Sequence, residues 1–572
     1  MTQPGGSTEG DSAVTQPDRP AEPDSAAQGD GAVTQPDRPA PDCPAQSDRA
    51  VTQPDRPAPD PPAQGDGAVT QGDCPAPDCL AQGDRVVTQP DPPSQPDPRS
   101  APGKPAPAAT RRILGLETEF GLTWAGGALT PEEAARELFQ DVVAWGRSSN
   151  VFLVNAARLY LDVGSHPEYA TAECVTLTDL IAQDVAGQRI LAQMAARTQQ
   201  RLAGAGTPGA LHLFKNNVDS VGNSFGCHEN YSVRRSTQVP TLHRGLIPFL
   251  VARQVLTGAG HILTSPRGAR YVYSQRADHV WESVSSATTR SRPMINTRDE
   301  ALADGALYRR LHVIVGDSSM CQATTLLKAG STDLVLRLIE AGAALPQMDL
   351  ASPAHAIRSI SHGSGNVALR DGREVSGTDI VEAYLDCVET YQADDAGPHP
   401  TDAAVLDLWR RAVGALRSGN LAQIERELDW AIKKRLIERY RERTGASLLD
   451  PRVARLELAY HDIGPDGLLQ RLEESGAAVK VVTEEQVRAA IVQPPANTRA
   501  ALRGRFIAAA RTAGTDYSVD WVTLKLGEPH RASVDLLDPF ATADGRVDAL
   551  IAGLEAGGGD PAARNEEEEG DP

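Results

Sequence analysis

The first 110 residues lack aromatic side chains entirely, and the chain's 8 Phe, 6 Trp and 11 Tyr all lie beyond them. Apart from Leu80 and a few valines, this segment has no large aliphatic residues, yet it holds 23 of the chain's 42 prolines. Such a composition cannot bury enough apolar surface to offset the entropy lost on ordering. We therefore predict a disordered tail over residues 1–110 and a globular part from about Arg111.

Other features are missing from the whole chain of 572 residues. No apolar run reaches the roughly 18 residues of a membrane span, and no signal-peptide pattern is present, which predicts a cytoplasmic protein without membrane contact. The net charge of −20 argues against a nucleic-acid partner and favours cationic partners such as metal ions or lysine-bearing proteins. The cysteines form no CxxC pair, which argues against a zinc site or a disulfide framework.

The tail contains an internal repeat, but the repeat does not have the pattern of a solenoid. The motif AVTQPDRPA recurs with its valine in register every 18 or 19 residues, at Val14, Val33, Val51, Val69 and Val87. Solenoid repeats carry apolar positions that stack, whereas these carry Pro, Asp, Gln and Gly. We interpret the tail as a low-complexity linker; a docking arm for a partner and a natural start near Arg111 are the alternatives.

The globular part predicts an α+β fold. A strand is expected over residues 112–120, and Thr130-Pro-Glu-Glu133 predicts a capping box that opens a helix ending at Gly146. Strands are expected at 151–154, 159–163, 211–215, 227–233 and 311–315, and helices at 178–202, 246–257 and 332–341. Because strands and helices mix without a regular alternation, we do not expect a doubly wound parallel sheet.

A helix-rich portion is expected from about residue 400. Asn420 and Gln423 resemble a capping box, and Ile424, Leu428, Ile432, Leu436 and Tyr440 form one apolar stripe at helical spacing. We interpret this stripe as core. The predicted domains are therefore a catalytic domain over 111–400, a smaller helix-rich domain over 401–545, and an acidic flexible end over 546–572 that includes Glu566–Glu569.

Two strands carry polar residues on alternate positions. Glu117 and Glu119 share one face of the first strand, where their charges, about 7 Å apart, would repel by roughly 2 kcal/mol unless a cation such as magnesium lay between them. Arg158, Tyr160 and Asp162 likewise share one face of a later strand, opposite Leu159 and Leu161. The alternatives are two solvated glutamates and a sheet surface with a salt bridge.

Two further stretches are candidates for a nucleotide or metal site. His228 and Asn230 alternate in Cys227–Tyr231, although a lone histidine is more often structural. Arg290, Arg292 and Arg298 lie within nine positions beside hydroxyl residues, and arginine forks match phosphate geometry. No Walker-type loop or dinucleotide-binding glycine pattern is present, so side chains and metal would have to hold any nucleotide.

In order and wording, these stretches closely resemble the family of the Pup–protein ligase and the Pup deamidase/depupylase. The resemblance extends from about Arg111 to Pro539 and is carried by GLETEFG, WGRSSNVFL, NAARLYLDVGSHPEYATAEC, LFKNNVDSVGNSFGCHENY, SSATTRSRPMINTRDE, YRRLHVIVGDSSM, LAYHDI, TRAALRGRFIAAA and VDWVTLKL. It implies a glutamine-synthetase-like catalytic domain whose curved, mainly antiparallel sheet is packed by helices.

The resemblance also implies a reaction and its residues. The expected activity is ATP- and magnesium-dependent joining of the C-terminal glutamate of Pup, through a γ-glutamyl phosphate, to lysines of target proteins, which tags them for the bacterial proteasome. Asp162 would be the general base. The implied magnesium ligands are Glu117, Tyr160 and Glu168; the implied ATP contacts are Arg158, Thr171 and Trp521, with His228, Asn230, Arg290 and Arg292 held more loosely.

The ligase and depupylase branches differ in one segment. The depupylase has an inserted loop between the first strand and the ARLY motif, whereas Glu117 and Asp162 here are only 45 positions apart (162 − 117). We therefore expect the ligase. The alternatives are the hydrolase of the same family, a catalytically silent Pup-binding module, and a small-molecule ligase of the same fold.

Overall fold

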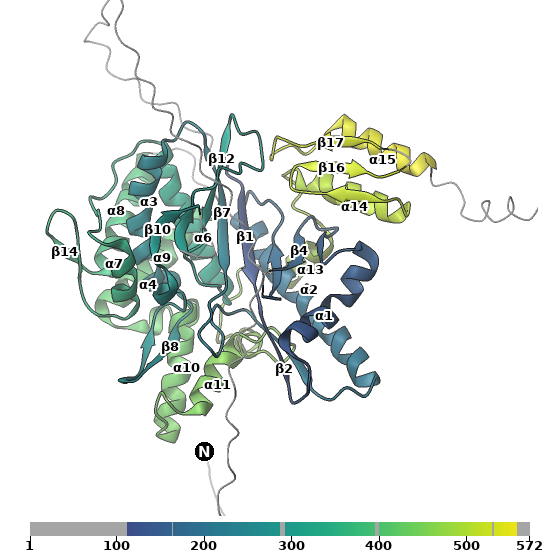
Figure 1. Ribbon diagram of the computed structural model, residues 1–572. Helices are drawn as coiled ribbons and strands as arrows, with labels where there is room; N and C mark the ends of the chain where they lie inside the picture. Colours follow the sequence, from purple (N-terminus) through teal and green to yellow (C-terminus); the bar gives the residue numbers. More distant parts are fainter. Residues whose placement is uncertain (1–110, 163, 287–291, 395–399, 529–530, 558–572) are drawn as a thin grey trace, which may run out of the picture. The chain divides into compact units, whose positions relative to one another are not determined.

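The computed structural model describes residues 111–557, apart from 163, 287–291, 395–399 and 529–530 (Figure 1). The predictions on residues 1–110, on Arg290 and on Glu566–Glu569 concern residues outside this description. In the part that is described, no helix is both long enough and apolar enough to cross a membrane.

An eight-stranded sheet carries the candidate site. Its strand order is β10-β11-β12-β7-β1-β5-β4-β3, and Figure 1 shows β12, β7 and β1 side by side. Every neighbouring pair is antiparallel except β10 with β11. The strands are β1 (Leu114–Glu119), β3 (Asn150–Phe152), β4 (Arg158–Leu161), β5 (Pro167–Ala170), β7 (Cys227–Arg234), β10 (Glu282–Ser285), β11 (Pro293–Asn296) and β12 (Tyr308–Val313).

The two faces of this sheet differ in polarity. Along β1, Leu114, Leu116 and Thr118 are buried, while Glu117 and Glu119 alternate with them on the opposite face. The buried leucines join the main core with α2 (Leu177–Gly204) and α6 (Gln322–Glu340). The alternation predicted from the sequence is therefore confirmed, and it leaves one face of the sheet free for chemistry.

Helices complete the main core on the apolar side. They are α3 (Val239–Ala252), α4 (Gln254–Thr257), α7 (Pro353–Ser361), α8 (Gly377–Asp394), α9 (Asp402–Ser418), α10 (Asp429–Thr444), α11 (Pro451–Tyr460), α12 (Leu468–Glu474) and α13 (Glu484–Val492). Trp409 of α9 and Trp430 of α10 are buried in the same core as β1. Residues on both sides of residue 400 thus share one hydrophobic core. The domain boundary at this residue stays a prediction.

The first helix begins as the sequence predicts. In α1 (Pro131–Gly146), the Thr130 hydroxyl accepts from the Glu133 amide at 3.2 Å, and the Glu133 carboxylate accepts from the Thr130 amide at 2.9 Å. This reciprocal capping satisfies two amides that the helix itself cannot pair. Leu138, Phe139 and Val142 of α1 then pack with residues of β3, β4 and β5 in a second, smaller core.

Small two-stranded sheets flank the large one. They are β2 (Gly121–Ala125) with β6 (Ala210–Phe214), β8 (His261–Ser265) with β9 (Gly268–Val272), and β13 (Val367–Ala368) with β14 (Glu374–Val375).

The C-terminal segment has a core of its own. It consists of α14 (Ala500–Thr512), β15 (Tyr517–Val519), β16 (Thr523–Leu526), β17 (Ser533–Asp535) and α15 (Gly545–Gly557), with Phe152 of β3. The prediction that the flexible end starts at residue 546 is wrong for residues 546–557. Val547 and Leu554 bury their side chains against α14, and this burial holds the segment as helix α15.

The predicted capping box at Asn420 is also wrong. Asn420 accepts from the Ala422 amide at 3.2 Å and caps only the short 3-10 helix Leu421–Gln423, while α10 begins at Asp429. Ile424 and Leu428 are nevertheless fully buried, so the apolar stripe is core as predicted. The stripe does not lie on one helix: Ile424 and Leu428 precede α10, and the later residues of the stripe belong to α10.

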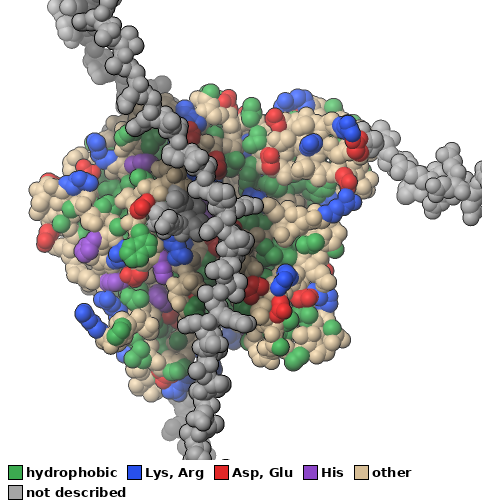
Figure 2. Space-filling view, viewed as in Figure 1, with side chains coloured by type: hydrophobic (Ala, Val, Ile, Leu, Met, Phe, Trp, Pro, Cys, Tyr) green, Lys and Arg blue, Asp and Glu red, His purple; other side chains and the backbone are tan. Residues whose placement is uncertain are grey.

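The exposed surface is mixed in character. Figure 2 shows hydrophobic side chains scattered between charged ones on the visible face. The exposed large hydrophobic residues of the described ranges include Val221, Trp281 and Leu307, from separate parts of the chain. No large apolar patch is gathered on the described residues of this face.

Candidate active site

Strand pairing assembles the polar face of the sheet. β1 lies between β5 and β7, so Glu117 is opposite His228 and Glu119 is opposite Glu168. Glu168 is in turn opposite Tyr160 of β4. Residues separated by up to 111 positions thereby lie in neighbouring strands on one face.

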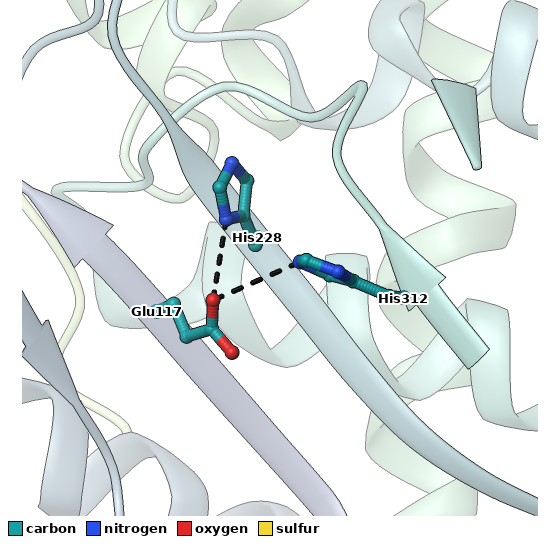
Figure 3. A group of neighbouring side chains, drawn as sticks. All are labelled: Glu117, His228 and His312. Atoms are coloured by element: carbon teal, nitrogen blue, oxygen red, sulfur yellow. Dashed lines mark hydrogen bonds and ion pairs between the residues drawn. The ribbon is translucent and has the colours of Figure 1, made fainter. Parts of the chain in front are cut away.

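Glu117 is the centre of a first cluster. Its carboxylate interacts with His228 Nδ1 at 3.2 Å and His312 Nε2 at 3.7 Å, as Figure 3 shows. It also accepts from Asn230 Nδ2 at 2.9 Å and from Arg310 Nη2 at 2.7 Å. Ligand atoms of Glu117, His228 and His312 all lie within 4.8 Å of one another, as a metal site requires.

The charges around Glu117 set its protonation. Burial alone would raise its pKa, but the hydrogen bond from His228 and the charge of Arg310 lower the pKa of Glu117 well below its usual range. Burial lowers the pKa of His312 to about 3. Glu117 is therefore ionised and His312 neutral near pH 7, which are the forms in which both side chains can bind a metal ion.

A second cluster contains only acids. Ligand atoms of Glu119, Asp162 and Glu168 lie within 4.8 Å of one another, with Asp162 immediately after β4. Within the described ranges, no arginine or lysine forms an ion pair with any of the three. Burial and the charges of Glu117 and Glu119 raise the pKa of Glu168 well above its usual range.

Tyr160 belongs to this second cluster. Its hydroxyl hydrogen-bonds to Glu168, and burial together with the neighbouring carboxylates raises its pKa. The two clusters adjoin at Gly226: a Cβ added there would lie 2.5 Å from Glu119 Oε1 and 2.5 Å from His228 Nε2. A glycine at this position keeps space free between the two groups of ligands.

A pocket opens beside the first cluster. It holds about 620 Å³ of space, part of it open to solvent. Its lining includes Glu117, Asn230, Arg310, Thr171 and Trp521. The Thr171 hydroxyl accepts from the Leu116 amide at 3.1 Å, which fixes Thr171 against β1. The structure thus brings together Glu117, Asn230, Thr171 and Trp521, as a nucleotide site would require.

Three predicted nucleotide contacts lie apart from this lining: His228, which belongs to the first cluster, and the arginines Arg158 and Arg292. Arg158 donates to Asn150 Oδ1 at 2.8 Å and stacks over the ring of its neighbour Tyr160, with 4.4 Å to the centroid. Arg292 has a positive φ of 39° and precedes β11. Neither is among the described residues that line the pocket.

Arg310 and His312 were not predicted from the sequence. They alternate in the strand Tyr308–Val313, and β12 pairs with β7 so that His312 is opposite Asn230. The signal was present as an Arg-x-His pattern in an otherwise apolar strand, but only the strand order places it beside Glu117.

The family follows from a comparison with known proteins. A family model described as Pup-ligase protein matches residues 112–525. The chain belongs to the Pup-ligase family. A relative from Xylanimonas cellulosilytica named Pup–protein ligase is 55% identical over 455 residues, which cover 78% of this chain and 100% of that protein.

Two solved structures of Pup ligases share the fold. One is a complex between the prokaryotic ubiquitin-like protein Pup and its ligase PafA; it has a TM-score of 0.77 at 44% identity and covers 80% of this chain and 94% of that one. The other is the Pup ligase PafA in complex with ADP, with a TM-score of 0.69 at 46% identity, covering 77% and 96%. The predicted family is confirmed, and these two structures share the α+β fold of this chain. The description of the catalytic domain as glutamine-synthetase-like stays a prediction.

Proposed function

We propose that this member of the Pup-ligase family uses ATP to join the C-terminal glutamate of Pup to lysine side chains of target proteins. The family membership and the relatives named Pup–protein ligase support this activity. The observation that carries it is the placement of two acid-containing clusters on one sheet face beside a pocket lined by Thr171 and Trp521.

The residues of this face fit magnesium. The ligand atoms of three acidic residues lie within 4.8 Å of one another, and a divalent ion would relieve the repulsion between their carboxylates. We assign Glu117, Tyr160 and Glu168 as magnesium contacts, and Glu119 joins them. Magnesium would neutralise charge on the phosphates during transfer.

The pocket fits the nucleotide. We assign Thr171 and Trp521 to ATP, since both line it beside Glu117, and a relative binds ADP. Asn230 and His228 lie where the nucleotide and the metal clusters meet. Arg158, Arg290 and Arg292 are proposed as further contacts for the phosphates, to which guanidinium groups are suited.

The reaction needs two transfers. A carboxylate is a poor acyl donor, so an oxygen of the Pup glutamate first attacks the γ-phosphorus of ATP, ADP leaves, and a γ-glutamyl phosphate forms. The lysine nitrogen then attacks the carbonyl carbon, phosphate leaves, and an isopeptide bond forms. Glu117 and Glu168 would hold the magnesium that neutralises the phosphates, and the arginines would orient the phosphate oxygens.

Asp162 is the proposed general base. A lysine in water has a pKa near 10.4, far above that of an aspartate, so the proton must leave as the C–N bond forms. Asp162 lies in the second cluster, within 4.8 Å of Glu119 and Glu168. A carboxylate at this position can accept the proton from an amine that approaches the sheet face.

We further propose that the protein acts in the cytoplasm and in connection with the bacterial proteasome. Cys174, Cys227 and Cys321 are buried as free thiols, which suits a reducing compartment. A relative of this fold is solved with Pup, which supports Pup as the partner.

The decisive experiment measures mass gain on a lysine-bearing protein mixed with Pup ending in Glu, ATP and Mg²⁺. We expect a gain equal to the mass of Pup minus one water, dependent on ATP. Asp162→Asn should bind ADP as tightly as the wild type and form no conjugate. Release of Pup from a preformed conjugate, without ligation, would instead indicate the hydrolase. Near-normal conjugation by Asp162→Asn would remove Asp162 from the role of base.

A further inference from the structure

A buried ion-pair group forms part of the wall of the proposed nucleotide pocket. Glu173, which is 6% exposed, follows β5 and lies two positions after Thr171. Its carboxylate accepts from Arg499 Nε at 2.8 Å and from Arg503 Nη1 at 3.1 Å, and Arg503 Nη2 forms a further ion pair with it. We refer to Glu173, Arg499 and Arg503 as the Glu173 group.

The Glu173 group connects two cores. Arg499 and Arg503 belong to the start and the first turn of α14 in the C-terminal core, whereas Glu173 continues from β5 of the large sheet. The Thr498 hydroxyl adds a bond to the Glu173 carbonyl at 3.0 Å. Glu173 is thus one of the points at which the C-terminal core is held against the sheet that carries Thr171.

Arg503 also contacts Trp521, so the ion pair with Glu173 is connected to this side chain. Its Nη1 donates to the Trp521 carbonyl at 2.9 Å, and its guanidinium lies 5.1 Å from the centroid of the Trp521 ring. The same guanidinium lies 5.2 Å from the Phe152 ring, which packs edge-on against Trp521 at 4.9 Å. Trp521 itself is only partly buried and lines the pocket.

Arg499 contacts another part of the pocket lining. It donates to the Leu302 carbonyl at 2.6 Å and to the Leu536 carbonyl at 2.7 Å. Leu302, Glu173 and Arg499 line the same pocket as Trp521. One carboxylate therefore binds two arginines, each of which contacts a residue of the pocket lining: Arg503 contacts Trp521 and Arg499 contacts Leu302.

We propose that Glu173 is a positioning residue for the nucleotide, which acts through Arg503 and Arg499 to hold Trp521 and the pocket lining. This inference rests on the proposed function, since it assigns the pocket to ATP. Glu173 does not touch the two acidic clusters in the described contacts, so its loss should weaken ATP binding and leave the chemical steps intact.

The test separates KM for ATP from kcat. We expect Glu173→Gln to raise KM for ATP and the Kd of ADP, measured by calorimetry, about tenfold, while kcat at saturating ATP stays within about twofold of the wild type. Arg503→Lys keeps the positive charge but cannot bond both Glu173 and the Trp521 carbonyl in the same fork, so it should raise KM in the same way. Arg503→Lys also provides a second test of the inference if Glu173→Gln fails to fold.

The matched control is Arg337→Lys. Arg337 also forms a buried fork, with Asp402 at 2.8 and 2.6 Å, between α6 and α9. This control should lower thermal stability without changing KM for ATP. An equal rise of KM in Arg337→Lys would overturn the inference, because the effect would then be general destabilisation.

Two further results are distinguishable. Unchanged KM and Kd in Glu173→Gln or Arg503→Lys, against a wild type that binds ADP, would overturn the positioning role alone. A wild-type protein that binds neither ATP nor ADP would overturn the proposed function and this inference with it.

Discussion

The buried Glu168 should destabilise the metal-free protein. It is 3% exposed, and its carboxylate lies within 4.8 Å of those of Glu119 and Asp162. At an effective dielectric constant of 20, two unit charges at that distance repel by about 3.5 kcal/mol. Proton uptake by Glu168 limits this cost, which is why its pKa is raised. We therefore expect Glu168→Gln to raise the free energy of unfolding of metal-free protein by about 2 kcal/mol at pH 8.

The stability difference between Glu168→Gln and the wild type should depend on pH. Because the pKa of Glu168 is higher in the folded than in the unfolded state, the folded protein binds more protons, and stability falls as pH rises. The contribution of Glu168 to the free energy of unfolding is fully present below pH 4.5, the ordinary pKa of a glutamate. This contribution is lost as the pH rises through the higher pKa that Glu168 has in the folded protein. The advantage of the Gln variant should accordingly be absent at pH 4 and grow towards pH 8.

Glu229→Gln is the matched comparison on the opposite face of the same sheet. Glu229 is fully buried and forms a fork with Arg253 at 2.6 and 2.7 Å. Burial would raise its pKa, but the charge of Arg253 lowers it, so Glu229 stabilises the fold at neutral pH. Its replacement should lower stability by about 3–5 kcal/mol, because Arg253 would stay buried without its partner.

The assay is urea unfolding and thermal melting in EDTA and with Mg²⁺. Mg²⁺ at ten times its Kd should stabilise the wild type by about 1.4 kcal/mol and should stabilise Glu168→Gln much less. A metal-free Glu168→Gln protein less stable than the wild type at pH 8, or equal stabilisation of both proteins by Mg²⁺, would refute the electrostatic reasoning.

Three further perturbations test other parts of the structure. Gly226→Ala should raise the Mg²⁺ concentration needed for half-maximal conjugation, since its Cβ would lie 2.5 Å from Glu119 and His228; an unchanged requirement would show that the two clusters do not share this space. Thr130→Ala should lower the free energy of unfolding by about 1 kcal/mol through the lost cap, without affecting KM for ATP. Deletion of residues 1–108 should leave conjugation in vitro intact, because 78% of this chain matches 100% of a relative's length; a large loss of activity would instead indicate a docking role for the tail.

Local sequence was sufficient to predict where helix α1 begins and which side chains share a face of a single strand. The capping residues at Thr130 and Glu133 act within one helical turn, so their role follows from four consecutive residues. Alternation in β1 likewise determines that Glu117 and Glu119 share a face, because neighbouring side chains of a strand point in opposite directions. The family also followed from sequence alone, since its motifs extend over nearly the whole globular part.

Local pattern failed where packing decides the structure. Asn420 and Gln423 have the spacing of a helix start, yet the chain turns and α10 begins later, at Asp429. Asp429 accepts from the amides of Met320 and Cys321 at 3.1 and 2.9 Å, a contact with the N-terminus of α6 that no local window contains. The helix at residues 546–557 was missed for the same reason, as its apolar side chains pack on α14.

Only the tertiary structure decided how the site is assembled. The strand order places β1 between β5 and β7, and this order brings Arg310 to Glu117 across 193 positions of sequence. Glu173 and Arg503 meet across 330 positions, so neither could be recognised as part of the pocket wall from its own surroundings. The sequence by itself determined which side chains were available on each strand and to which family the chain belongs. The pairing of distant strands, driven by burial of their common apolar face, decided which of those side chains meet.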